Sequence, residues 1–255
     1  MNEKAPLPQP AAYPRSATYG EAFMLETAMG PNVLWLAEAV TAKMDLEPGM
    51  RVLDLGCGRA ASSIFLAKEF GVSVVAVDLW IKPTENWRRI QEHGVDGLVM
   101  PIAAEAHALP FADGYFDAIV SLDAYHYFGT DDLYAWTIAR FLRPGGVLGI
   151  AVPGVTAELD EPPPHLAPYW DPQFMSFHSP AWWRRHLARS GLFASVEADA
   201  IPDAAEHWAR WEEFRAAAAN SSPGSPRTSS QDAEMLRADA ARTLLLQRII
   251  ARKPE

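Results

Sequence analysis

Short runs of β-branched and aliphatic residues alternate along the chain with stretches whose apolar residues repeat at helical spacing. This alternation predicts parallel strands that are joined by crossover helices. We expect seven strands, at residues 51–55, 72–77, 97–101, 118–122, 147–152, 193–198 and 243–252. The last two strands are not separated by a crossover of the earlier kind. The pattern therefore predicts an α/β protein with a mostly parallel seven-stranded sheet and an antiparallel last strand.

Helix signals fill the gaps between these strands. We expect helices at residues 31–43, 60–70, 85–92, 131–142, 180–189 and near 206–219. Pro31 occupies a favoured first-turn position, Ser179 precedes a helix as a cap, and Gly71 and Gly94 follow helices as stop signals. Helices between successive parallel strands cover both faces of a sheet, so the fold is predicted to be Rossmann-like and doubly wound.

Three segments fall outside this regular pattern. Residues 1–19 carry repeated prolines, which predicts a flexible or loosely docked arm. Residues 153–179 are rich in proline and aromatic residues, and we interpret them as a cap over a pocket, with a packed surface loop as the alternative. Residues 220–231 contain five serines and two prolines, which predicts a mobile loop. A length of 255 residues otherwise fits a single domain, 1–255.

Composition narrows the setting and the partners. The chain has 22 Lys and Arg against 32 Asp and Glu, a formal net charge of -10, which disfavours a nucleic-acid partner. Its one cysteine, Cys57, fits a reducing compartment, and the first twenty residues contain no apolar signal core, so we expect a cytoplasmic protein. No apolar run approaches the ~20 residues of a membrane span. The seven histidines show no metal-ligand spacing, and we expect no metal. The oligomeric state stays open.

The strongest chemical signal is a strand, an acid and a glycine loop at residues 51–61, RVLDLGCGRAA. Gly56 and Gly58 allow a tight turn that approaches a ligand, and the following helix offers free N–H groups. The same spacing satisfies the dinucleotide fingerprint, and Asp78 stands 22 residues after Gly56, where a ribose-binding acid belongs. Asp54, however, would repel a pyrophosphate and favour the ammonium and sulfonium of S-adenosylmethionine.

Five segments in order resemble the class I S-adenosylmethionine-dependent methyltransferases, specifically the small-molecule branch related to ubiquinone and menaquinone methylation. They are residues 52–58 (VLDLGCG), 75–78 (VAVD), 104–111 (AEAHALPF), 115–121 (YFDAIVS) and 142–146 (LRPGG). The resemblance covers roughly residues 32–152. This sequence departs from the family pattern at two positions, since the third motif glycine is replaced near Ala60 and the usual adenine-binding Asp is Glu105.

The resemblance implies a set of residues that hold S-adenosylmethionine. The methionine half would meet the first motif, and Asp78 would hold the ribose hydroxyls. The residues after Asp78 would flank adenine, Glu105 would receive the adenine amino group, and Leu122 and Asp123 would border the sulfonium. The implied cofactor-binding residues are Asp54, Gly56, Cys57, Gly58, Asp78, Leu79, Trp80, Ala104, Glu105, Ala106 and Leu122.

The candidate reacting centre is the segment that follows the fourth strand, where open α/β sheets bind ligands. Its candidate catalytic residues are His126, Tyr125 and Asp123. An imidazole can accept a proton at neutral pH, and a tyrosine ring can stabilise a methyl-cation-like centre. A packed core histidine is the alternative for His126.

We therefore predict transfer of a methyl group from S-adenosylmethionine to a small-molecule acceptor by in-line displacement. The sulfonium is already a good leaving group, so the protein mainly aligns the nucleophile and excludes water. Two alternatives stay open, an NAD(P)-dependent oxidoreductase and a non-catalytic S-adenosylmethionine-binding module. The acceptor and the atom that is methylated are not determined by the sequence. DNA base methylation is disfavoured, since no Asn-Pro-Pro-Tyr type motif follows the fourth strand.

Overall fold

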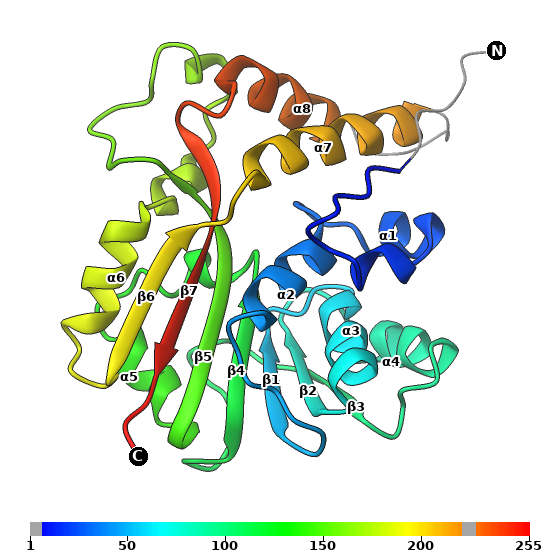
Figure 1. Ribbon diagram of the computed structural model, residues 1–255, viewed down its shortest axis with the longest axis vertical. Coiled ribbons are helices and arrows are strands. Elements are labelled where there is room, and N and C mark those ends of the chain that lie inside the picture. Colours follow the sequence, from blue (N-terminus) through cyan, green and yellow to red (C-terminus); the bar gives the residue numbers. More distant parts are fainter. Residues whose placement is uncertain (1–6, 221–227) are drawn as a thin grey trace.

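The structure is a computed structural model that describes residues 7–220 and 228–255. These residues build a seven-stranded sheet of order β3-β2-β1-β4-β5-β7-β6, which Figure 1 shows from one side. The strands are β1 (Arg51–Leu55), β2 (Ser73–Asp78), β3 (Val99–Ala103), β4 (Phe116–Leu122), β5 (Leu142–Val155), β6 (Ser195–Ala200) and β7 (Leu244–Arg252). Strands β1 to β5 pair in parallel, and β7 lies antiparallel between β5 and β6. The predicted fold class is confirmed.

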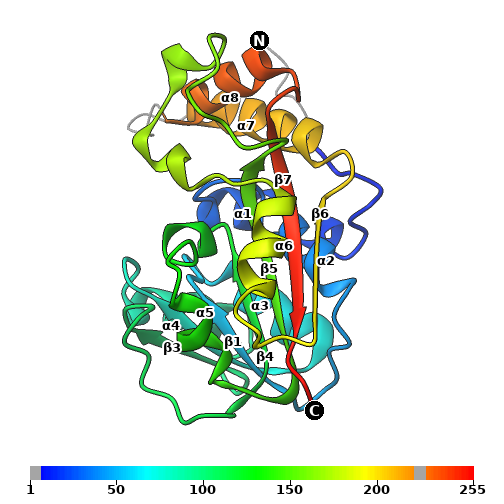
Figure 2. The ribbon, with the colours of Figure 1, turned by 90° about the vertical axis from the view of Figure 1, so that its left-hand side faces the viewer.

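Helices cover both faces of this sheet (Figures 1 and 2). They are α1 (Glu21–Thr27), α2 (Val33–Thr41), α3 (Ala61–Phe70), α4 (Pro83–Glu92), α5 (Tyr134–Ala139), α6 (Pro180–Ala188), α7 (Ala204–Asn220) and α8 (Thr228–Asp239). Short 3-10 turns are η1 (Ser16–Thr18), η2 (Tyr125–Tyr127), η3 (Ala167–Tyr169) and η4 (Pro172–Ser176). No helix in the described ranges combines the length and apolar composition of a membrane span.

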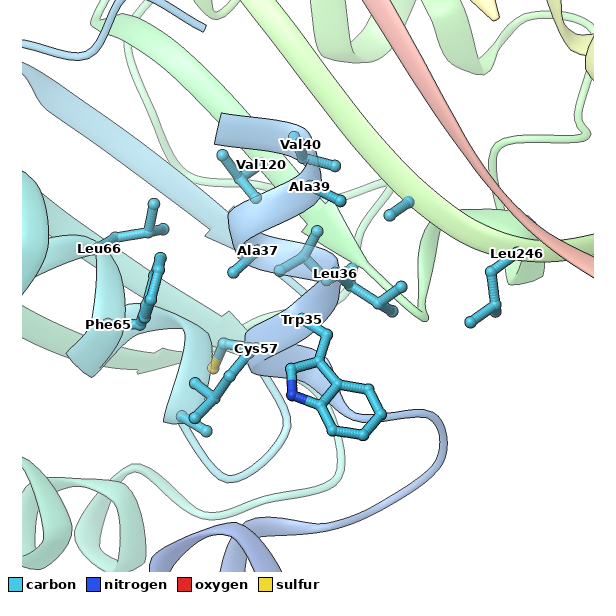
Figure 3. Packing of buried hydrophobic residues seen from close by; sticks show 14 of the residues in the cluster. Trp35, Leu36, Ala37, Ala39, Val40, Cys57, Phe65, Leu66, Val120 and Leu246 are labelled. Carbon is cyan, nitrogen blue, oxygen red and sulfur yellow. The ribbon is translucent and has the colours of Figure 1, made fainter. Parts of the chain in front are cut away.

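Two hydrophobic clusters form the core, one on each face of the sheet. Successive residues of a strand point to opposite faces, so Val52 packs in the cluster under α2 and α3, and Leu53 packs in the cluster under α5 and α6. Figure 3 shows the first cluster, in which Trp35 and Val40 extend from α2. Because both faces are covered, the central strands read as continuous apolar runs.

Two boundaries differ from the sequence prediction for a reason of pairing. Strand β5 begins at Leu142, five residues before the predicted start, because Leu142 pairs with Phe116 across a register shift at the start of β4. The helix predicted at 131–142 is correspondingly reduced to α5 (Tyr134–Ala139). Helix α1 was not predicted.

The first described residues are docked against the body of the protein. Tyr13 and Ser16 are buried. The backbone N–H and the hydroxyl of Ser16 donate to Glu38 of α2 at 2.8 and 2.7 Å, and the Tyr19 hydroxyl donates to Glu69 of α3 at 3.1 Å. These contacts hold residues 7–19 against two helices, whereas residues 1–6 of the predicted arm lie outside the described residues.

The structure has helix at both ends of the predicted loop at 220–231. Asn220 is the last residue of α7, and residues 228–231 form the first turn of α8. Residues 221–227 lie outside the described residues. Helices α7 and α8 pack together beyond the carboxyl end of β5, at the top of Figure 1. The buried side chains Trp211 and Phe214 of α7 and Leu236 of α8 anchor this pair to the core.

Candidate functional site

A cavity of about 290 Å³ lies at the carboxyl ends of β1, β2 and β4. Its walls come from the loop after β1, the end of β2, the segments after β3 and β4, the connection between α1 and α2, and one side chain of α7. Ligand pockets occupy roughly 300–1,000 Å³ and, in open α/β sheets, lie outside the carboxyl ends of the strands. The cavity therefore has the place and the approximate size of a ligand site.

The glycine loop forms one wall in a conformation that needs glycine. Gly56 and Gly58 have φ values of 75° and 51°. A Cβ at Gly56 would overlap the Cβ of Ala124, which follows β4. The backbone N–H groups of Gly56 and Cys57 donate to the carbonyl of Val77 at 2.8 and 3.0 Å. The loop is thus fixed to β2 and lies close against the segment after β4.

The replaced third glycine does not change this geometry. Ala60 itself adopts the left-handed conformation, with φ 62°. It precedes α3, and its carbonyl accepts the first helical hydrogen bond from Ile64 at 3.0 Å. A non-glycine residue with positive φ is uncommon and strained, so the surrounding structure imposes the turn that the sequence no longer favours.

Asp78 holds the loop and faces the cavity. One carboxylate oxygen accepts the N–H of Gly58 at 2.8 Å, and the other accepts the N–H groups of Trp80 and Ile81, each at 2.8 Å. The Leu79 and Trp80 side chains beside it line the cavity and are more than half exposed, at 62% and 68%. An acid at a strand end beside exposed apolar surface fits the ribose and base of a nucleoside.

Asp54 lies beneath the loop instead of lining the cavity. Its Oδ2 accepts hydrogen bonds from the hydroxyls of Ser62 and Ser63, both at 2.6 Å. Burial raises the pKa of Asp54 to about 6, although these two hydrogen bonds oppose the rise. Its Oδ1 has no partner among the described residues. Asp54 was predicted to contact a cofactor, but in this structure it does not line the cavity.

The other predicted cofactor residues all line the cavity. They are Gly56, Cys57, Gly58, Asp78, Leu79, Trp80, Ala104, Glu105, Ala106 and Leu122. Glu105 accepts hydrogen bonds from the backbone N–H of His107 and from its Nδ1, both at 2.8 Å. The bond from the His107 side chain lowers the pKa of Glu105 and keeps this carboxylate ionised.

The three predicted catalytic residues are separated by the structure. Asp123 lines the cavity, in the left-handed conformation with φ 54°. Tyr125 is fully buried and packs against Trp183. His126 is 1% exposed and packs against Phe177 at a ring distance of 5.4 Å. Neither Tyr125 nor His126 lines the cavity.

We expect His126→Ala to act on stability. Burial lowers the pKa of His126 to about 3, so the folded protein keeps this imidazole neutral. Between pH about 6.5 and about 3 the unfolded chain binds a proton that the folded chain excludes, and stability is lost as the pH falls through this window. Removing the buried ring should lower the free energy of unfolding by about 2–4 kcal/mol at neutral pH and flatten the acid-side dependence.

Thermal unfolding at neutral pH and within that acid window measures both effects. Tyr127→Ala, a change at the neighbouring half-exposed ring, is the matched control and should leave the acid-side dependence unchanged. A His126→Ala protein with an unchanged melting temperature and a turnover reduced by about 10²-fold would instead support the predicted proton-accepting role.

Comparison with known proteins shows which family the residues around this site resemble. Residues 52–146 match the family model described as "Methyltransferase domain". These residues are similar to that domain, and they include the glycine loop, Asp78 and Glu105 of the cavity wall. The chain is 35% identical over 106 residues to 2-methyl-6-phytyl-1,4-hydroquinone methyltransferase of Synechocystis, covering 42% of this chain and 33% of that protein. It is 28% identical over 159 residues to glycine/sarcosine/dimethylglycine N-methyltransferase of Actinopolyspora halophila, covering 61% and 27%. The chain thus spans less than half the length of these relatives.

Solved structures share the fold of residues 52–146 and of the elements around them. A phosphoethanolamine N-methyltransferase of Haemonchus contortus in complex with S-adenosyl-L-methionine has a TM-score of 0.74 at 19% identity, covering 96% of this chain and 58% of that one. A geranyl diphosphate C-methyltransferase of Streptomyces coelicolor in complex with S-adenosyl-L-homocysteine has a TM-score of 0.66 at 20% identity, covering 85% and 76%. At these identities the likeness shows the fold.

Sequence reasoning missed the lining residues that come from outside residues 52–146. Met29 and Gly30, between α1 and α2, line it, and so does Trp211 of α7, far outside residues 52–146. The indole N–H of Trp211 donates to the carbonyl of Gly30 at 3.0 Å, which ties these two segments together. The turn signal Gly30-Pro31 was visible in the sequence, but its distance from the glycine loop was not.

The predicted cap at 153–179 contributes no lining residue. It touches the site through Tyr127, which lines the cavity and whose hydroxyl donates to Gln173 at 3.0 Å. Its aromatic residues Phe174 and Phe177 stack on each other at 4.8 Å. The described part of the chain contains no group of three or more His, Cys, Asp and Glu residues that could hold a metal ion.

Proposed function

We propose that the protein transfers a methyl group from S-adenosylmethionine to a small-molecule acceptor. The observation that carries the proposal is the cavity in which the glycine loop, Asp78 and Glu105 meet at the strand ends of residues 52–146. When bound, S-adenosylmethionine supplies a methyl group on a sulfonium, whose departing sulfur is a neutral thioether. The relatives and solved neighbours with methyltransferase names support the same activity.

The residues present fit this donor. The Asp78 carboxylate is aligned by three backbone N–H groups and faces the cavity, as an acid that holds two ribose hydroxyls must. The exposed Leu79 and Trp80 offer apolar surface for the base, and ionised Glu105 can accept from an amino group. Leu122 and Asp123 would then border the reacting atoms, and enclosure by Trp211 would limit the entry of water.

The class of acceptor is proposed as a small molecule. The quinone-related branch suggested by the sequence is supported by the hydroquinone methyltransferase of Synechocystis. Relatives named for fatty acids, glycine derivatives and sterols match over similar lengths, so identity does not favour one acceptor. A cytoplasmic location, based on the single Cys57, stays a prediction from the sequence.

A binding titration tests the donor directly. We expect saturable binding of S-adenosylhomocysteine in calorimetry and none of NADH, because the carboxylate of Asp54, beneath the glycine loop, would repel a pyrophosphate bound over that loop. Binding of NADH instead would favour the oxidoreductase alternative. Binding of S-adenosylmethionine without release of S-adenosylhomocysteine across acceptor libraries would favour a non-catalytic module.

A further inference from the structure

The end of the cavity beyond β4 contains an acid that would border the reacting atoms. Asp123 lines this end, and one of its carboxylate oxygens lies so close to Gly30 that a Cβ there would overlap it. No hydrogen bond to the Asp123 carboxylate is found within residues 7–220 and 228–255. A partly buried carboxylate in that state is costly unless a donor or a cation reaches it.

The cation that acts on Asp123, Arg215, already forms an ion pair with another acid. Arg215 of α7 donates to both carboxylate oxygens of Glu212, at 2.9 and 2.7 Å, and to the carbonyl of Gly30 at 3.2 Å. Glu212 is fully buried, so this pair is held tightly behind the cavity wall. The negative charge of Glu212 therefore offsets much of the attraction between Arg215 and Asp123.

The remaining charges near Asp123 are negative. Burial raises the pKa of Asp123 to about 8, with repulsion from Glu212 and Asp232 adding to the rise and Arg215 opposing it. An added positive charge at this end would relieve that repulsion and favour the ionised carboxylate.

The rest of the wall favours a cation over an anion. The half-exposed ring of Tyr127 lines the cavity and follows Asp123 by four residues. Ring faces attract ammonium groups. Arg59 is the arginine among the described residues that line the cavity. Its Nη1 donates to the carbonyl of Glu26 at 2.5 Å. A carboxylate or phosphate acceptor at this end of the cavity would be repelled by the ionised carboxylate of Asp123.

We propose that the methyl acceptor is an amine, which binds as its ammonium form between Asp123 and the ring of Tyr127. This inference rests on the proposed methyl transfer. The ammonium gives one N–H proton to the Asp123 carboxylate, and the freed lone pair of nitrogen attacks the methyl carbon of the sulfonium donor. The N–C bond forms as the C–S bond breaks, and sulfur keeps the electron pair of the broken bond. The methylated ammonium carries the positive charge away, and Asp123 releases its proton to solvent.

Matched ligands and variants test the inference. The probes are benzylamine and hexylamine, with benzyl alcohol and hexanol as neutral counterparts, titrated into the complex of the full chain with S-adenosylhomocysteine. We expect the amines to bind and the alcohols to bind at least about tenfold more weakly, because the alcohols lack the charge that Asp123 would meet. Addition of S-adenosylmethionine should convert the bound amines to their N-methyl products.

Asp123→Asn keeps the shape of the side chain and removes its charge. It should weaken amine binding at least about tenfold while leaving the affinity for S-adenosylhomocysteine unchanged. Asp113→Asn, at an exposed acid before β4, is the matched control and should change neither. Should Asp123→Asn fail to fold, Asp123→Ala is expected to show the same loss.

Three results would overturn the inference. They are equal binding of amines and alcohols, amine binding that Asp123→Asn does not weaken, and no amine binding at millimolar concentration in the presence of S-adenosylhomocysteine. If Asp123→Asn weakened the binding of S-adenosylmethionine but not that of the amines, the carboxylate would interact with the sulfonium, and the inference would also be wrong. Failure of S-adenosylhomocysteine itself to bind would refute the proposed function, and the inference with it.

Discussion

Gly56→Ala is expected to lower the free energy of unfolding by about 2–5 kcal/mol and to abolish measurable binding of S-adenosylhomocysteine. The left-handed backbone of Gly56, with φ 75°, costs a side chain about 1–2 kcal/mol. Overlap of the new Cβ with Ala124 adds about 1–3 kcal/mol of overpacking. The only relief is a shift of the loop away from the segment after β4, which would deform the cavity wall.

Two further glycines separate the contributions to this loss. Gly94 also has a positive φ, 67°, but a Cβ there would meet nothing within 4 Å. Gly94→Ala should therefore show only the backbone cost, about 1 kcal/mol, with unchanged ligand binding. Gly97→Ala, where neither positive φ nor a close neighbour is present, should leave both quantities nearly unchanged. Chemical denaturation and calorimetry measure the set, and a Gly56→Ala protein that binds normally would contradict the assignment of the loop.

Asp78→Ala is expected to weaken S-adenosylhomocysteine binding by about 1–3 kcal/mol, or about 5- to 150-fold in Kd. The substitution removes the carboxylate that would accept from the ribose. It also leaves the N–H groups of Gly58, Trp80 and Ile81 without the acceptor that now orders them. Both losses act on the same wall of the cavity.

Asp78→Asn distinguishes these two effects. The amide keeps one carbonyl oxygen as an acceptor, so part of the loop order should persist while the charge that favours ribose hydroxyls is lost. We expect its Kd to fall between those of the wild type and Asp78→Ala in calorimetry. An Asp78→Ala protein that binds as tightly as the wild type would show that the ribose is held elsewhere.

The succession of the strands along the chain could be predicted because each strand signal is local. Strand β1 occupies the predicted residues, Arg51–Leu55, since a short and largely apolar segment between a turn and a glycine loop has few alternatives. The placement of the loop residues and Asp78 at one cavity also follows from local rules, because parallel strands end at the same edge of a sheet.

The orientation of side chains on the short turn after β4 could not be predicted in this way. Tyr125, His126 and Tyr127 are consecutive, and the sequence treats them as equally able to face a ligand. On η2, Trp183 and Phe177 from distant segments enclose the first two, whereas Tyr127 reaches the cavity wall. Packing against residues more than fifty positions away decided which ring faces the site.

The sequence by itself determined the sheet, the glycine loop and the acids at its edge, because periodicity, turn residues and strand ends act over a few residues. Only the tertiary structure decided what closes the cavity. Gly30 precedes the sheet and Trp211 follows six of its strands, yet their hydrogen bond joins the two walls. Such a contact depends on how whole elements pack, and no local pattern in either segment encodes the position of the other.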